Sequence, residues 1–495
     1  INMCPSDVEE DNKRVCEIKK NVNECIHKDV KAFFIRRLQY CGGAESVTKL
    51  EKYLNSADLY APALAALTSI GKPESGALVL KNLSNKTGLQ QLAMVKTLGQ
   101  LKYQPAESSL IELTKTAKGE LLQHTYTALA NIGGKASVPT FEAAALAVGY
   151  QPDAAGTMAS YMQLAKRLAA QGETSLSNQL CAVVLKNCTN ENQMIYRSEA
   201  LAVPGFGNNE LFLKEIKNSN KVYRNAVLNN ASAQLNSGNV ESWIAATKKA
   251  PAETKAEILH FLAKRSEPVV LQKAILPALK AKEEVVRLEA IRSLALNQKA
   301  NAVPALIDQL KKSKSPAEVA EIEQALRIST SVKESGLLTA QLEGMNDAGK
   351  IVLMNVLGAR RATEAYPLIK KQSSSPNPEV SAAAFIALET VAKSENAVDL
   401  IGMLKQVSDK KAAANLQNAL INIYSGTEKP DAGLVLKEIQ SGGMTEKLIP
   451  VLSSLNDPKA LKTVVGLLKS SNSAEREAAF VSLANWKNTK AAPHL

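Results

Sequence analysis

The chain has 495 residues and a formal net charge of +12; 45% of its residues are hydrophobic, yet only 4% are aromatic. This composition excludes long disorder, a collagen-like chain and a disulfide-dense scaffold. No run of about 18 uninterrupted apolar residues occurs, so no membrane span is predicted. A core rich in Ala and Leu, with few aromatic rings, favours helices over strands.

Residues 1–30 are predicted to form an N-terminal capping segment. The chain begins at Ile1 without a basic-then-apolar signal, which indicates a processed product, and we expect an exported protein of the periplasm or cell surface. Four of the six cysteines lie within the first 41 residues: Cys4, Cys16, Cys25 and Cys41. Their spacing matches no zinc motif and leaves two interpretations open, disulfides in an oxidising compartment or reduced, buried thiols.

Residues 31–149 are predicted to contain helical repeats with a period of about 31 residues. In each repeat an Ala-rich first helix ends near a recurring leucine, and a short loop leads to a second apolar helix. These anchor leucines are Leu67, Leu98 and Leu129 in this part of the chain. Such a helix pair cannot bury its apolar faces alone, so neighbouring pairs are expected to stack.

Residues 150–200 are predicted to hold an irregular repeat or a bend, because the repeated phrase is longer and looser there. Leu201 and Leu262 fit the phrase again, and the gap after Leu129 leaves room for five repeat steps. Cys181 and Cys188 are two helical turns apart, about 10 Å, which is too far for a disulfide unless the helix ends between them.

Residues 201–495 are predicted to return to regular repeats that are truncated at the C-terminus. The anchors recur at steps of 31 or 32 residues: Leu294, Leu326, Leu357, Leu388, Leu420, Leu452 and Leu483. Second helices are predicted to start at Val138-Pro139, Val303-Pro304 and Tyr366-Pro367, because proline suits the first helical turn. The sequence therefore predicts an all-α fold, an α–α superhelix of about fifteen antiparallel helix pairs.

The repeated phrase has a family likeness. Residues 286–294 (VRLEAIRSL) with 302–306 (AVPAL), and 475–483 (EREAAFVSL) with 491–493 (AAP), resemble HEAT-like repeats of the phycobiliprotein-lyase type. The resemblance covers most of the chain from about residue 30 onward. It implies a HEAT/ARM-type solenoid and is uninformative about function, because such arrays serve scaffolds, adaptors and a few enzymes.

Two further stretches, residues 31–40 (KAFFIRRLQY) and 54–64 (LNSADLYAPAL), resemble exported HEAT-repeat proteins of Bacteroidetes. In that family the solenoid is often followed by a 3-keto-disaccharide hydrolase-type β-sandwich linked to carbohydrate processing. The last residues, 491–495, are predicted to be the first turn of a helix with Pro493 near its start. We therefore expect that more protein follows Leu495; none of the sandwich's active-site residues can be assigned here.

No catalytic, cofactor-binding or metal-binding pattern is found in the sequence, and no cofactor is expected. The four histidines lie in different repeats without metal-ligand spacing: His27, His124, His260 and His494. His124 and His260 fall inside helical phrases, which favours structural roles. No phosphate-binding glycine loop or nucleophile elbow occurs, and the glycines are typical of helix ends.

The basic residues form the candidate binding site. Many lysines lie where second helices end, and the candidate partner-binding rim consists of Lys311, Lys312, Lys370, Lys371, Lys405 and Lys469. If second helices line the concave surface, these lysines form a ladder that could hold an acidic partner. The alternative interpretation is that lysines at helix C-termini offset the exposed carbonyls, an effect worth about 0.3–1 kcal/mol each.

The leading functional hypothesis is a non-catalytic interaction scaffold that binds a protein, a glycan or its own C-terminal domain along the concave face. A second hypothesis is the N-terminal portion of a carbohydrate-active hydrolase whose catalytic domain follows residue 495. A third, nucleic-acid binding, is disfavoured because lysines dominate over Arg forks and only Trp243 and Trp486 offer indole faces. Trp486 occupies a repeat position expected to be core.

Overall fold

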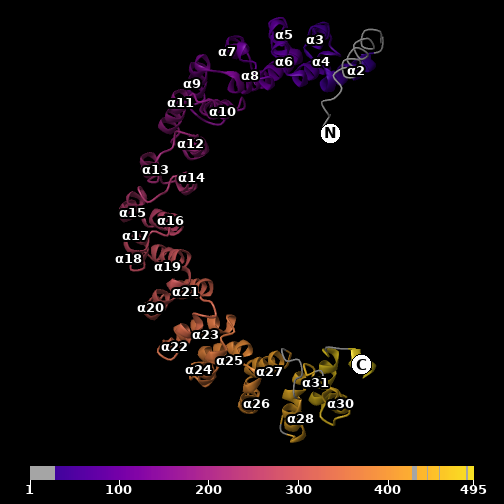
Figure 1. The fold of residues 1–495 in the computed structure, drawn as a ribbon, viewed down its shortest axis with the longest axis vertical. Coiled ribbons are helices and arrows are strands. Elements are labelled where there is room, and N and C mark those ends of the chain that lie inside the picture. Colours follow the sequence, from indigo (N-terminus) through magenta and orange to yellow (C-terminus); the bar gives the residue numbers. More distant parts are fainter. Residues whose placement is uncertain (1–27, 426–431, 443, 456, 487–488, 495) are drawn as a thin grey trace, which may run out of the picture. The chain divides into compact units, whose positions relative to one another are not determined.

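The computed structural model describes residues 28–425, 432–442, 444–455, 457–486 and 489–494. Over these residues every regular element is helical. The chain divides into two compact units, Ile1–Asn236 and Ser237–Leu495, and each is a stack of antiparallel helix pairs (Figure 1). The predicted all-α solenoid is confirmed. None of the described helices combines the length and the apolar character that crossing a bilayer requires.

The N-terminal unit alternates first helices, the class that carries the anchor leucines, with second helices. Its first helices are α2 (Lys28–Cys41), α4 (Tyr60–Ile70), α6 (Gly88–Gln100), α8 (Gly119–Ile132), α10 (Thr157–Ala170), α12 (Met194–Leu201) and α14 (Lys221–Ser232). Its second helices are α3 (Ala44–Leu50), α5 (Pro73–Leu83), α7 (Glu107–Thr114), α9 (Val138–Ala147), α11 (Thr174–Asn187) and α13 (Asn209–Glu215). Short 3₁₀ turns, η2 (Gln104–Ala106) and η3 (Lys135–Ser137), lead into α7 and α9.

The C-terminal unit continues the same alternation. Its first helices are α16 (Ala252–Ala263), α19 (Glu284–Gln298), α21 (Pro316–Ser329), α23 (Asp347–Ala359), α25 (Pro378–Val391), α27 (Lys410–Ser425), α29 (Thr445–Leu452) and α31 (Ser473–Ala484). Its second helices are α15 (Val240–Lys249), α17 (Pro268–Val270) with η5 (Leu271–Ile275) and α18 (Leu276–Ala278), α20 (Val303–Lys312), α22 (Ser335–Gln341), α24 (Tyr366–Gln372), α26 (Ala397–Gln406), α28 (Gly433–Gln440) and α30 (Pro458–Leu467). The 3₁₀ turn η9 (Thr489–His494) follows α31.

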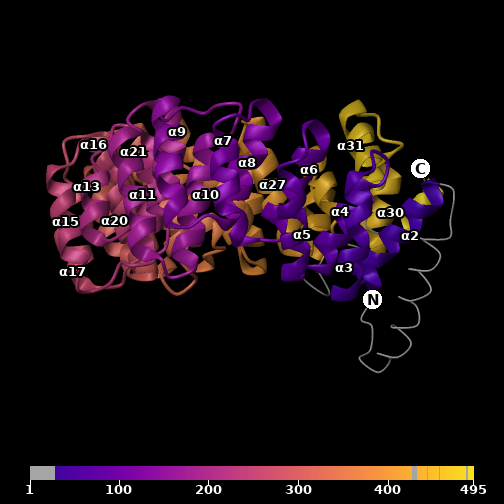
Figure 2. The same ribbon diagram turned by 90° about the horizontal axis from the view of Figure 1, so that it is seen from above.

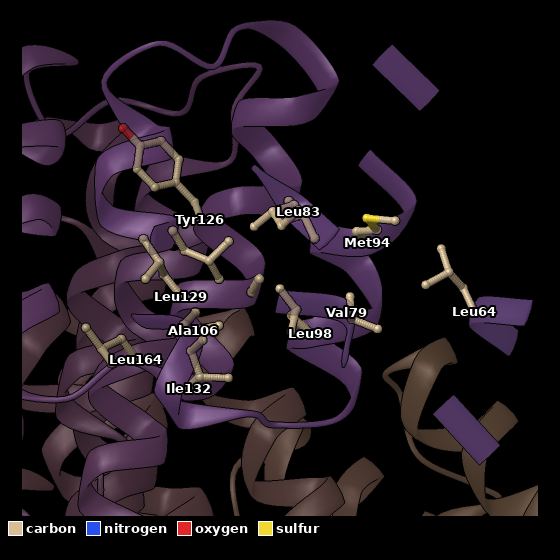
Figure 3. Close-up of a cluster of buried hydrophobic side chains, with 14 of the residues drawn as sticks. Leu64, Val79, Leu83, Met94, Leu98, Ala106, Tyr126, Leu129, Ile132 and Leu164 are labelled. Carbon is tan, nitrogen blue, oxygen red and sulfur yellow. The ribbon is translucent and has the colours of Figure 1, made fainter. Parts of the chain in front are cut away.

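The anchor leucines form the core of both units. Each is at most 2% exposed and lies in a first helix: Leu67, Leu98, Leu129, Leu201, Leu262, Leu294, Leu326, Leu357, Leu388, Leu420, Leu452 and Leu483. In Figure 3, Leu98 and Leu129 lie in a cluster that also holds side chains of second helices, such as Val79. Burial of this repeated leucine is what forces neighbouring helix pairs to stack.

Three second helices begin at the proline-containing positions predicted from the sequence. Proline occupies the first turn of α9, α20 and α24, and the pattern Leu306, Ile307 and Leu310 buries one face of α20. The missing N–H of proline costs nothing there, because the first turn has no intrahelical acceptors for its amides.

Small residues bring consecutive first helices close together. A Cβ atom added to Gly99 of α6 would lie 2.8 Å from the Cα of Ala128 in α8, and one added to Gly358 of α23 would lie 3.3 Å from the Cα of Ala387 in α25. Figure 2 shows the helices of each unit standing side by side, with their axes across the direction of stacking.

One expectation about the layers is wrong. Second helices were expected to line the concave surface, but within the C-terminal unit the first helices α19–α27 lie inside the bend of the ribbon and the second helices α20–α26 lie outside it (Figure 1). The contacts around Gly358 explain the difference. Because small residues shorten the spacing between first helices, the stack curves toward that layer.

Two of the three described cysteines and both tryptophans are buried, whereas Cys41 is partly exposed and its thiol donates to the carbonyl of Arg37. Cys181 and Cys188 are fully buried free thiols, and α11 ends between them at Asn187 without bringing them into a disulfide. Burial raises the pKa of Cys181 to about 12 and that of Cys188 to about 11. Trp486 is buried, as expected. Cys4, Cys16, Cys25, His27 and nearly all of the predicted 1–30 capping segment lie outside the described residues.

Candidate partner-binding surfaces

The candidate rim lysines gather at the C-terminal ends of second helices, as predicted. Lys311 and Lys312 end α20, Lys370 and Lys371 lie in the last turn of α24, Lys405 lies in the last turn of α26, and Lys469 follows α30. They therefore occupy one edge of the second-helix layer, on the outside of the bend. A role of this rim in partner binding stays a prediction.

Half of the six rim lysines form ion pairs with neighbouring repeats. Lys370 Nζ lies 2.7 Å from Asp399 Oδ2, Lys371 Nζ lies 2.6 Å from Glu343 Oε1, and each pair joins two consecutive second helices. Lys405 pairs with Glu438 at 2.5 Å, and Lys311 donates a hydrogen bond to the amide oxygen of Gln341 at 2.7 Å.

These pairs match the charge of three of the six rim lysines locally. The hydrogen bond from Lys371 lowers the pKa of Glu343 below its ordinary value, so the carboxylate is ionised at neutral pH. Lys312 and Lys469 are exposed and form no ion pair with any described residue. Exposed pairs of this kind contribute at most about 1 kcal/mol each, so the rim stabilises stacking only weakly.

A second surface, the first-helix face of the C-terminal unit, was not singled out from the sequence. Positions two residues before and two after an anchor leucine point away from the buried leucine, because each lies about 160° from it around the helix. On α19, α21 and α25, three large aliphatic side chains occupy these positions: Leu296 is 47% exposed, Ile328 is 75% exposed and Ile386 is 56% exposed, and Val481 takes such a position further along the layer, on α31. We call Leu296, Ile328 and Ile386 the apolar face.

Polar side chains hold the first helices in register around the apolar face. His260 Nδ1 lies 3.0 Å from Glu289 Oε1, and Arg292 pairs with both Glu289 and Glu321 of the next repeat. The hydroxyl of Thr390 donates to the carbonyl of Gly358 at 2.8 Å. These contacts join α16 to α19, α19 to α21 and α23 to α25, so the backbone beneath the apolar face is fixed before any partner binds.

Two cations, Lys102 and Arg361, share a left-handed turn that usually selects glycine, and Lys299 also has a positive φ, +50°. Gly71, four residues after its anchor, has φ +64°, and Lys102 and Arg361 take the same repeat position with φ +50° and +52°. In each cation's turn two backbone hydrogen bonds close the helix end, from Tyr103 N to Leu98 O (3.2 Å) and from Lys102 N to Gly99 O (3.3 Å) in the first case. A side chain in this left-handed conformation costs about 1–2 kcal/mol.

The described histidines have structural surroundings. His124 Nε2 lies 3.5 Å from Glu120 Oε1 one helical turn earlier, and partial burial lowers the pKa of its ring. His260 belongs to the polar contacts between α16 and α19. Among the residues that the structure describes, no group of three or more potential metal ligands comes together.

The most deeply buried charges also have structural surroundings. Glu215 of α13 accepts hydrogen bonds from Tyr223 (2.7 Å) and from Arg197 (2.5 Å to the nearer nitrogen), and its side chain is only 5% exposed. Burial and the adjacent carboxylate raise the pKa of Tyr223 far above its ordinary range. The network ties α12, α13 and α14 together and opens to no described cavity.

Sequence comparisons find no match: no protein-family model fits the chain, and no curated protein is similar to it. Solved structures similar to the chain include Kap121p bound to Nup53p, with TM-score 0.41, 12% identity and coverage of 96% of this chain and 57% of that one. Kap121p bound to Ste12p has TM-score 0.40 and 12% identity, with coverage of 96% of this chain and 57% of that one. A structure of Kap95p with RanGDP has TM-score 0.34 and 13% identity, with coverage of 96% of this chain and 70% of that one. The chain thus spans little more than half the length of Kap121p. Likeness at this level carries no argument about partners or activity.

Proposed function

We propose that the chain is a non-catalytic interaction scaffold that binds a protein partner along the first helices of the C-terminal unit, the concave side of that unit. The observation that supports this proposal is the apolar face. Leu296 and Ile328 lie two residues after their anchors on the neighbouring first helices α19 and α21, and Ile386 lies two residues before its anchor on α25 of the same layer. Exposed aliphatic side chains surrounded by polar groups are typical of the core and rim of a protein-protein interface.

The free energy gained by burying apolar side chains identifies the residues that contribute most to partner binding. Fully burying an isoleucine side chain contributes about 1.5–3 kcal/mol, and Ile328 and Ile386 begin more than half exposed. Burial of both against a partner therefore supplies a share of affinity that a charge substitution would remove. A scattered exposed residue would not do this, because a partner could bind without covering it.

The experiment compares two variants with the same number of charge changes on the two layers. The double variant Ile328→Glu/Ile386→Glu alters the apolar face, and Val398→Glu/Leu337→Glu alters the exposed side chains of the second helices α26 and α22, which are 65% and 50% exposed. Proteins cross-linked to each variant in native extract are quantified by mass spectrometry. The proposal predicts a set of proteins captured by the wild type and the control and lost with the double variant. Equal capture by all three would contradict it, and capture of glycan-modified proteins that survives in the double variant would favour a glycan site elsewhere.

A second candidate is the one that the sequence resemblance suggests: the array carries a carbohydrate-active domain of the 3-keto-disaccharide hydrolase type, in an exported protein. The observation that favours it lies on α31, where Phe480 and Val481 are 55% and 49% exposed. Phe480 stands three residues before its anchor, and its equivalents Leu64, Val95 and Ile291 are buried. A further folded module packed on α31 would cover this face. The intact mass of the protein purified from its native source tests the proposal; a mass that equals the 495 residues alone would contradict it.

A further inference from the structure

The N-terminal unit carries a row of unpaired cations along the edge where first helices end. Lys72 follows α4, Lys102 follows α6 and Lys135 follows α8, and all three side chains are exposed. None of the three forms an ion pair or side-chain hydrogen bond with a described residue. This row, which we call the basic edge, therefore differs from the rim lysines at the ends of second helices, three of which form ion pairs.

The nearby acidic groups compensate only part of the charge of the basic edge. Glu74 lies on the first turn of α5, two residues after Lys72. The carboxylate of Glu107, at the start of α7, accepts hydrogen bonds from the backbone amide of Gly134 and the hydroxyl of Ser137, each at 2.7 Å, and so lies in the loop that carries Lys135. Three cations at successive repeats thus have two neighbouring carboxylates, Glu74 and Glu107, and the edge keeps a net positive charge.

The backbone at Lys102 shows that a cation has replaced the residue that best fits the fold. Gly71 fills the same repeat position one step earlier, with φ +64°. Lysine is retained at φ +50°, although glycine adopts this conformation without strain. Violations of a local structural rule concentrate at functional sites, and Lys102 shares this positive φ with Tyr150, Lys299 and Arg361 among the described residues.

A hollow of 340 Å³ lies between the first two loops of the row. Lys72 and Pro73 line one side, and Lys102, Tyr103 and Pro105 line the other. The ring of Tyr103 packs against the backbone of α5, since a Cβ atom added to Gly76 would lie 2.3 Å from it. Two cations therefore flank an apolar floor made of one aromatic and two proline rings.

The spacing of the row selects the shape of its ligand. Stacked helices lie about 8–10 Å apart, so successive loops carry their lysines at about this interval. An extended peptide advances about 3.3 Å per residue, and three residues span one interval. We propose that the basic edge binds an extended acidic segment of a partner protein, with carboxylates at every third position and an apolar residue between the first two that enters the hollow.

The chemistry of the row favours a peptide over nucleic acid. Lysine is a compact point charge that suits carboxylates, whereas the row contains no Arg fork, and Tyr103 is its single aromatic ring among the described lining residues. The basic edge belongs to the N-terminal unit and shares no residue with the apolar face, so this inference goes beyond the proposed function and can fail or succeed separately from it.

The test uses the full chain and a labelled synthetic peptide with Asp at every third position and Leu beside each Asp. Fluorescence anisotropy is measured for the wild type, for Lys72→Glu/Lys102→Glu/Lys135→Glu, and for the charge-matched control Lys312→Glu/Lys314→Glu/Lys469→Glu. We expect at least tenfold weaker binding for the first triple variant and less than a twofold change for the control. The Ile328→Glu/Ile386→Glu variant should bind this peptide like the wild type.

Three results would overturn the proposal: equal weakening by both triple variants, equal binding of a peptide with the same residues but contiguous Asp, or displacement of the peptide by single-stranded DNA at equal or lower concentration. The variant Lys102→Gly separates binding from folding. This variant is expected to bind the peptide about threefold more weakly than the wild type and to have a higher melting temperature. Unchanged affinity with a raised melting temperature would remove Lys102 from the site and overturn the hollow as the binding point.

Discussion

Replacing Lys102 by glycine is predicted to stabilise the protein, although it removes a charged side chain from a helix end. The substitution relieves a left-handed conformation that costs a lysine about 1–2 kcal/mol. Glycine gives back about 0.5–1 kcal/mol through its greater freedom in the unfolded chain. The lost attraction between the ammonium and the helix C-terminus removes a further few tenths of a kcal/mol or more. The net expectation is a gain of up to about 1 kcal/mol.

Thermal unfolding followed by circular dichroism measures this gain. For a unit of this size, about 1 kcal/mol corresponds to a rise in melting temperature of about 2–4 °C. The matched control is Lys115→Gly, at φ −71° after α7, where glycine has no conformational advantage and stability is expected to fall. A lower melting temperature for Lys102→Gly, or the same change for both variants, would refute the assignment of strain to this turn.

Three further changes test the packing and the buried charges. Gly99→Ala should destabilise the chain by about 1–3 kcal/mol in urea unfolding, because the added Cβ atom would clash with α8. The control is Gly402→Ala in α26, where no atom lies within 4 Å of the added Cβ atom and a gain of about 0.5–1 kcal/mol is expected. Equal effects of the two substitutions would contradict the close contact at Gly99. Glu215→Gln should cost about 3–5 kcal/mol because it leaves a buried guanidinium without its carboxylate, and a loss below about 1 kcal/mol would show that the pair is solvated. Cys181 and Cys188 should resist alkylation at pH 8 until the chain unfolds, because burial keeps their pKa at about 12 and 11, above the ordinary 9.0. Because both thiols are neutral when folded, they contribute to the stability of the folded state at pH values below about 9. This contribution is lost as the pH rises from about 9 to about 11–12, because over that range the thiols ionise only in the unfolded chain. Stability that does not change between about pH 9 and about pH 12 would contradict the burial.

The period of the sequence predicted the core but not the curvature. A leucine such as Leu357 recurs at a fixed step because every helix pair must bury the same face, so register and burial follow from the sequence alone. Which layer lies inside a bend depends on small differences in helix spacing between the two layers. Those differences come from contacts such as Gly358 against Ala387, whose closeness no composition reveals.

The candidate site could be predicted only in part for a related reason. The lysines of the rim were found at helix ends, where sequence places them, but their partners Glu343 and Asp399 come from neighbouring repeats. A register alignment of the repeats shows both acids about one period away from Lys371 and Lys370, so the signal was present. The apolar face needed one more step, which is the angular position of a residue such as Ile328 relative to its anchor leucine.

The affinity of the isolated partner for the apolar face tests the scaffold proposal most directly. Isothermal titration of a partner recovered by cross-linking would compare the wild type with Ile328→Glu/Ile386→Glu and with Val398→Glu/Leu337→Glu. Fully burying an isoleucine contributes about 1.5–3 kcal/mol, and Ile328 and Ile386 are 75% and 56% exposed before binding. Because a tenfold change in affinity corresponds to about 1.4 kcal/mol, we predict at least a tenfold loss of affinity for the double variant and a loss below twofold for the second-helix control. Equal affinity for all three proteins would contradict the proposal that the first-helix layer of the C-terminal unit is the binding surface.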